Sequence, residues 1–115
     1  MNNSSCSPLL SSLARLVVYQ KALGVAQLVV RLDVSGSLGD QLSRAASSLV
    51  LNIAEGAGER TRATKRRYYA IARGSLFEVG AALDLVALRR VDGALAEIAP
   101  LLEELDRILS ALMRR

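Results

Sequence analysis

Apolar residues recur at alternating steps of three and four along almost the whole chain, which is the period of a helix that buries one side. No stretch alternates apolar and polar residues over the length of a strand, and the 115 residues include only two prolines. The pattern therefore predicts an all-α protein, an up-down-up-down four-helix bundle. The clearest of the four apolar rows is Tyr69, Ala72, Leu76, Val79, Leu83 and Val86.

Turn residues divide the first half of the chain into two predicted helices. The first is predicted over about residues 11–32 and the second over about residues 37–55. Ser37 with Asp40 three residues later resembles a capping box, in which Asp40 replaces the usual glutamate. The Gly-Ala-Gly sequence at 56–58 is typical of a helix that ends on a glycine cap.

The second half of the chain predicts two further helices. Thr61 or Thr64 is suited to cap the third helix, which is expected to end near Arg90. The fourth follows a short break at residues 91–93 and contains Pro100, whose missing N–H predicts a kink or a new helix beginning beside it. We expect residues 1–10 to form a flexible N-terminal tail and residues 11–115 to form one bundle domain.

The first helix is apolar on more sides than one bundle core can cover. Within residues 16–32, Gln20, Gly24, Gln27 and Arg31 form one narrow polar stripe, and most other positions are apolar. A surface helix normally has an apolar arc of only about 100° or somewhat more. The third helix carries a second apolar row as well. The sequence therefore predicts self-association of the chain.

The composition excludes most catalytic chemistries for a single chain. There is no histidine, the commonest general base, and only one cysteine, Cys6. We therefore predict no catalytic residue, no metal site and no cofactor, and no enzymatic activity. The most apolar run is interrupted by polar and charged residues, so we expect no membrane span and a cytoplasmic location.

A block of positive charge is the strongest candidate for a binding surface. Residues 60–73 carry six positive charges and no negative one, within a net charge of +4 for the chain. Cations at a helix start oppose the helix macrodipole, so a ligand is one reason to retain them. Phosphate contacts of nucleic acid are the first possibility, an acidic protein partner the second, and a solvated helix start the third. The six residues are Arg60, Arg62, Lys65, Arg66, Arg67 and Arg73.

Two further groups of polar residues are better explained by structure than by catalysis. Asn52 and Glu55 are expected to form hydrogen bonds near the end of the second helix. Arg44 or Arg73 is expected to pair with Glu55 or Glu78 across neighbouring helices. If Glu55 forms such a pair in a buried setting, its loss should be strongly destabilising.

Three stretches carry a resemblance to a known family: VVYQKA at 17–22, QLSRAA at 41–46 leading to NIAEG at 52–56, and IARGSLFE at 71–78. Over Leu16 to Met113 the chain resembles the four-helix-bundle proteins of bacterial 23S rRNA intervening sequences. Their fold is related to the accessory variability determinant of diversity-generating retroelements. The motif residues of this resemblance are Arg44, Asn52, Glu55, Gly56, Arg73, Gly74, Ser75 and Glu78.

The resemblance implies a non-enzymatic bundle that assembles as a homopentamer. It also implies a link to ribosomal RNA or, through the retroelement relative, to a reverse transcriptase. Together with the basic block, this favours a structural protein that binds nucleic acid, RNA in preference to DNA. The alternative is a protein scaffold or an accessory subunit of a reverse transcriptase.

Overall fold

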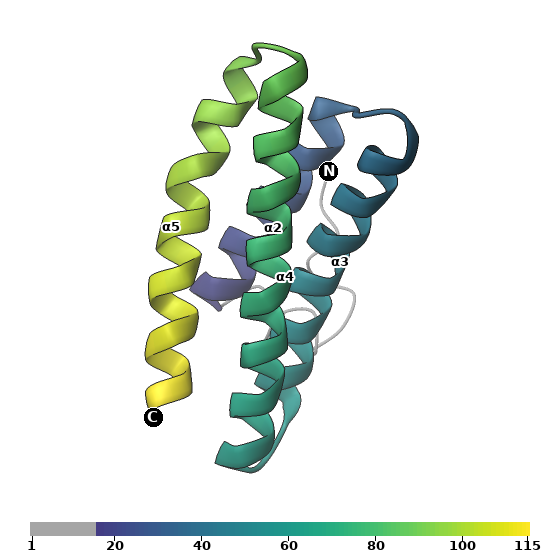
Figure 1. The fold of residues 1–115 in the computed structure, drawn as a ribbon. Helices are drawn as coiled ribbons and strands as arrows, with labels where there is room; N and C mark the ends of the chain where they lie inside the picture. The colour runs from purple at the N-terminus through teal and green to yellow at the C-terminus, as the bar shows by residue number, and fades with distance from the viewer. Residues whose placement is uncertain (1–15) are drawn as a thin grey trace, which may run out of the picture.

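The computed structural model describes residues 16–115, which form four helices that run alternately up and down (Figure 1). They are α2 (Val17–Leu32), α3 (Gly36–Gly58), α4 (Arg62–Arg89) and α5 (Gly93–Arg114). Helices α2 and α4 each pack against α3 and α5, so α2 and α4 occupy opposite corners of the bundle. The predicted all-α, four-helix fold is confirmed.

The core contains side chains from all four helices. The apolar row predicted for the third helix is buried along its whole length, from Tyr69 to Val86. The apolar row of the second helix is buried as well, and it consists of Leu38, Leu42, Ala45, Leu49 and Ile53. The largest side chains that are fully buried are Leu42, Leu49, Ile53, Ile98, Leu105, Leu109, Val25, Val79 and Val86.

The turn between α2 and α3 depends on backbone shapes that the sequence pattern did not indicate. Asp33 adopts a left-handed conformation with φ of 49°, and its N–H donates to the carbonyl of Val30 at 3.2 Å. Gly36 has φ of 76°, a region that glycine enters without steric cost. The N-cap of α3 is Ser35, whose side chain makes no capping hydrogen bond. The predicted capping box of Ser37 and Asp40 is therefore wrong.

Two of the predicted helix boundaries also need correction. Leu16 has extended backbone and α2 begins at Val17, about five residues later than predicted. The predicted start near residue 11, like the predicted tail at 1–10, lies outside the described residues. Helix α3 continues through residues 56–58 to an extended residue, Glu59, so the glycines there do not form a left-handed cap.

The start of α4 agrees with the sequence prediction, whereas α5 does not break at its proline. Thr61 caps α4 as predicted, because its hydroxyl accepts a hydrogen bond from the backbone N–H of Thr64 at 3.1 Å. Helix α5 is continuous from Gly93 to Arg114 and contains Pro100, so no new helix begins beside the proline. Asp92 caps its start by accepting from the N–H of Ala94 at 2.9 Å.

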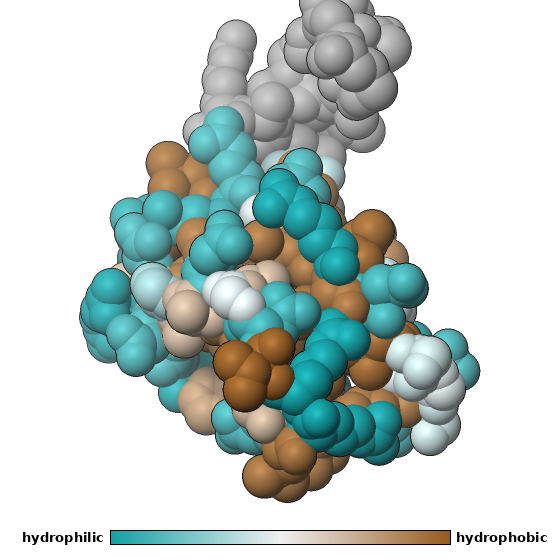
Figure 2. Space-filling model, turned by 90° about the horizontal axis from the view of Figure 1, so that it is seen from above, coloured by the Kyte–Doolittle hydropathy of each residue, from teal (hydrophilic) through white to brown (hydrophobic). Residues whose placement is uncertain are grey.

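Several large apolar side chains remain on the surface of the single chain. Figure 2 looks down on the molecule from above and shows brown hydrophobic side chains between teal hydrophilic ones. Within the described part of the chain, no helix combines the length and apolar character needed to cross a membrane. The most exposed of these apolar residues on the helices are Val17, Val30, Leu51, Phe77 and Leu88.

Candidate nucleic-acid interface at the start of α4

Five of the six predicted cations lie together at one end of the bundle. Arg60 is in the turn between α3 and α4, and Arg62, Lys65, Arg66 and Arg67 occupy the first two turns of α4. The sixth cation, at position 73, lies further along the same helix. The cations that are neighbours in the sequence between residues 60 and 67 are therefore also neighbours in the structure.

The ends of two other helices explain why cations are tolerated at this helix start. The Lys65 ammonium group donates to the carbonyl oxygens of Gly56 at 3.2 Å and Ala57 at 3.1 Å, at the end of α3. The guanidinium of Arg66 donates from Nε to the carbonyl oxygen of Met113 at 3.1 Å, at the end of α5. The last carbonyls of a helix carry partial negative charge, which these two cations neutralise. No ligand is needed to account for Lys65 and Arg66.

Arg73 is engaged by an acidic residue and an aromatic ring. Its Nε lies 2.6 Å from Oδ1 of Asp106 on α5, and its guanidinium is 4.8 Å from the centre of the Phe77 ring. Both members of the ion pair are about four-tenths exposed. The partner of Arg73 is therefore Asp106 and neither Glu55 nor Glu78, which corrects the predicted pairing. We accordingly exclude Arg73 from the basic group.

The remaining cations of the group form none of the ion pairs found within residues 16–115. These are Arg60, Arg62 and Arg67, all of them exposed. The guanidinium of Arg67 lies 6.0 Å from the centre of the Tyr68 ring, within reach of a weak cation–π contact. Three exposed guanidinium groups at one end of the molecule can bind phosphate.

Arg114 and Arg115 join this group, although the sequence did not suggest it. They end α5, and Nη2 of Arg66 lies 3.4 Å from the carbonyl oxygen of Arg115. In an up-down bundle the last residues of the fourth helix return to the level where the third begins. We call Arg60, Arg62, Lys65, Arg66, Arg67, Arg114 and Arg115 the basic end.

An open hollow of about 1090 Å³ adjoins the basic end. Its apolar lining includes Leu16, Leu51, Tyr69 and Leu112, and its cations include Arg60, Arg62, Lys65 and Arg115. Burial raises the pKa of the Tyr69 phenol, and the nearby Arg115 charge lowers it by less. A phenol is protonated at neutral pH at its ordinary pKa, and the raised pKa keeps the Tyr69 phenol in that form. The hollow thus combines positive charge with apolar side chains, and Glu55 is the one acidic side chain among its lining residues within 16–115.

The motif residues in the middle of α3 and α4 hold these two helices together. Asn52 donates from Nδ2 to the carbonyl oxygen of Ser48 at 2.8 Å, and Ser48 Oγ lies 2.7 Å from Ser75 Oγ. The Ser75 residue is only 4% exposed, so this hydrogen bond satisfies a buried hydroxyl. The chain Asn52–Ser48–Ser75 is a structural link and offers no reactive group.

The other charged motif residues do not pair as predicted. Arg44, Glu55 and Glu78 are exposed, and none of them belongs to an ion pair among residues 16–115. Arg44 and Glu78 line a shallow hollow between α3 and α4. The predicted pairing of these residues across helices is wrong, and the condition for a strongly destabilising Glu55 substitution is not met.

Replacing Glu55 by alanine is therefore expected to change the free energy of unfolding by no more than about 0.5 kcal/mol. The carboxylate is exposed and lies in the last turns of α3, where a negative charge gains nothing from the helix macrodipole. Urea unfolding of the variant and the wild type, followed by circular dichroism, measures this difference. A loss of 2 kcal/mol or more would mean that Glu55 has a partner that the single chain does not contain.

The fold and the site define a class of protein: an all-α four-helix bundle with one basic end. The family model for the 23S rRNA-intervening sequence protein matches residues 14–113. The chain belongs to this family.

One solved structure illustrates the shared fold. It is the crystal structure of a protein with unknown function from the S23 ribosomal protein family of Bacteroides thetaiotaomicron. The TM-score is 0.77 at 21% sequence identity, covering 86% of this chain and 100% of that chain. No curated protein matches the chain significantly.

Proposed function

We propose that this chain is a non-enzymatic, self-associating protein of the cytoplasm that binds nucleic acid through phosphate contacts at its basic end. One observation carries the proposal: Arg60, Arg62 and Arg67 lie at the same end of the bundle as Arg114 and Arg115, and none of the five forms an ion pair within residues 16–115. Phosphate contacts of this kind fix position and do not distinguish bases.

A preference for RNA over DNA is part of the proposal, and it rests on the family to which the chain belongs. The family is named for an intervening sequence of 23S rRNA. A ring of five chains is the assembly that the sequence resemblance implies. In a ring the basic end is repeated, so that several weak phosphate contacts act together on one ligand.

The salt dependence of binding to a single-stranded RNA tests the nucleic-acid proposal. The logarithm of the affinity should fall linearly with the logarithm of the salt concentration, by about 0.7 per phosphate contact. The double variant Arg60→Ala, Arg62→Ala should flatten this slope by about 1.4 for each protomer bound, because two contacts are lost. Fluorescence anisotropy of a labelled RNA, and of a DNA of the same sequence, measures both slopes and the preference.

A matched control removes the same charge from the opposite half of the bundle. Arg44 and Arg89 are exposed and outside the basic end, so the variant Arg44→Ala, Arg89→Ala should keep the wild-type slope. If both variants lose the same slope, the basic end is not the binding site. If no RNA or DNA binds even at low salt, the nucleic-acid proposal is wrong and the alternative stands: a protein scaffold or an accessory subunit, for example of a reverse transcriptase.

A further inference from the structure

Helix α4 presents a second apolar row that no other part of residues 16–115 buries. The row follows steps of three and four on the side of α4 that points away from the core, and it contains three small and three large residues. Phe77, Leu85 and Leu88 are its large members, and all three are exposed, Leu88 to 82%. We call Ala70, Gly74, Phe77, Ala81, Leu85 and Leu88 the α4 face.

Gly74 is the member of this face for which the chain itself gives no reason. A glycine inside a helix is less favourable than alanine because it loses more backbone freedom on folding. A Cβ atom added at Gly74 would have no neighbour within 4 Å, and its φ is not positive. Packing within residues 16–115 therefore does not require glycine here, whereas close approach of the backbone of a second chain would require it.

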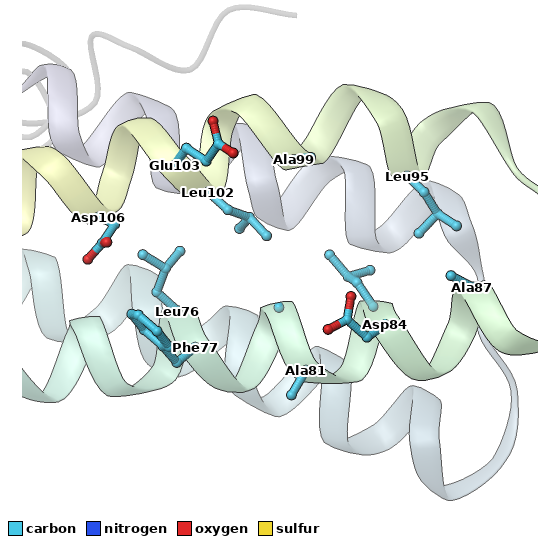
Figure 3. Close-up of a pocket in the computed structure, with 12 residues that line it drawn as sticks. Leu76, Phe77, Ala81, Asp84, Ala87, Leu95, Ala99, Leu102, Glu103 and Asp106 are labelled. Carbon is cyan, nitrogen blue, oxygen red and sulfur yellow. The ribbon is translucent and has the colours of Figure 1, made fainter.

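A groove between α4 and α5 continues the α4 face. It has a volume of about 520 Å³ and lies between the two helices (Figure 3), and its lining residues include Phe77 and Ala81 of α4 and Leu102 of α5. Its carboxylates include Asp84 and Glu103, which form none of the ion pairs within residues 16–115. The groove is therefore apolar along its length and negatively charged at its edges.

Helix α2 carries a similar row on its own outer side. Leu23 and Val30 are exposed, Val30 to 76%, and Gln27 lies between them at steps of four and three. None of these three side chains is charged. An exposed charge that adjoins this row is Arg31, four residues after Gln27, and it forms none of the ion pairs within residues 16–115. We call Leu23, Gln27 and Val30 the α2 face.

We propose that the α2 face of one copy packs against the α4 face and the adjoining groove of a second copy. This inference rests on the self-association within the proposed function and identifies the surfaces that carry it. The α2 and α4 faces lie on opposite corners of the bundle, so the contact joins unlike surfaces and repeats from copy to copy. Charge favours this arrangement, because it brings Arg31 to a groove bordered by Asp84 and Glu103. A symmetric contact between two α4 faces would instead bring Asp84 and Glu103 of one copy close to the same carboxylates of the other copy. It would also make no use of the α2 face.

Two single substitutions and their mixture test the inference. Val30→Arg alters the α2 face and Leu88→Arg alters the α4 face, each at a highly exposed position that the folding of one chain does not use. Light scattering should show that the wild type is an oligomer and that each variant alone is a monomer. Mixed in equal amounts, the two variants should form a dimer of one chain of each kind. One intact α2 face and one intact α4 face remain in the mixture, and native mass spectrometry identifies the pair.

Leu51→Arg serves as the control, since Leu51 is an exposed leucine of α3 outside both faces, and it should keep the wild-type mass. Three results would overturn the inference while the wild type remains an oligomer. Val30→Arg could keep the wild-type mass, Leu88→Arg could keep it, or the mixture could contain monomers only. A monomeric wild type at micromolar concentration would instead overturn the self-association on which the inference rests. The RNA titrations above test nucleic-acid binding separately.

Discussion

Replacing Leu49 by alanine is expected to lower the free energy of unfolding by about 2–5 kcal/mol. Leu49 has no exposed surface and lies in the core contributed by all four helices. The substitution removes buried methyl groups and leaves a cavity that the tightly packed neighbours fill only in part. A domain of this size has a total stability of about 5–15 kcal/mol, so the loss is a large share of it. Urea unfolding followed by far-UV circular dichroism measures the change.

Leu51 is the matched control for Leu49 on the same helix. It lies two residues further along α3, on the outer side, and is 66% exposed. Leu51→Ala should change the free energy of unfolding by less than about 0.5 kcal/mol, because little surface returns to water. All three proteins are compared at one protein concentration, since self-association makes apparent stability depend on concentration. Equal losses for both variants would contradict the arrangement of α3 in the bundle.

Replacing Gly56 by valine is expected to lower the free energy of unfolding by about 1–3 kcal/mol through overpacking. A Cβ atom at this position would lie 2.7 Å from Cε1 and 2.9 Å from Cδ1 of Tyr69. The Tyr69 residue is only 8% exposed and packs in the core, so a displacement of its ring disturbs the side chains packed against it. Valine has only a slightly better helix propensity than glycine, which offsets a few tenths of a kcal/mol.

Gly58 provides the comparison for this substitution. It also lies in α3, and a Cβ atom added there would meet nothing within 4 Å. Gly58→Val should therefore leave the midpoint of thermal unfolding within about 2 °C of the wild type, whereas Gly56→Val should lower it clearly. If Gly56→Val unfolds at the wild-type temperature, the close contact between α3 and Tyr69 is not present.

The helical period predicted the fold because it reports directly which side of each helix is buried. The row from Tyr69 to Val86 is an example: six positions predicted from spacing alone are all in the core. The Thr61 cap was predictable for the same reason, since its hydroxyl bonds to a backbone N–H only three residues away. Local sequence determines both features.

The residues whose roles were predicted wrongly are residues that contact distant parts of the chain. Gly56 resembles a helix cap in the sequence, yet its small size makes room for Tyr69, thirteen residues later on the next helix. Arg73 pairs with Asp106, which is 33 residues away and on a different helix from Glu55 and Glu78. Spacing along one helix cannot indicate which neighbour a side chain meets.

The candidate interface likewise has one part that the sequence predicted and one part that it did not predict. The run from Arg60 to Arg67 was visible as a local excess of charge, and it remains together at the start of α4. The addition of Arg114 and Arg115 depends on the level at which α5 ends, and the engagement of Lys65 and Arg66 depends on the ends of α3 and α5. The sequence therefore predicted the charge but not how much of it is available to a ligand.

The opposite-corner placement of α2 and α4 has a consequence for the polarity of any ring built through them. Rotation about a single axis keeps every copy pointing the same way along that axis. All the basic ends would then lie on one rim, and all the α4–α5 turns on the other. Such a particle would have two unlike sides, and a nucleic-acid strand would be able to approach it productively from one of them only.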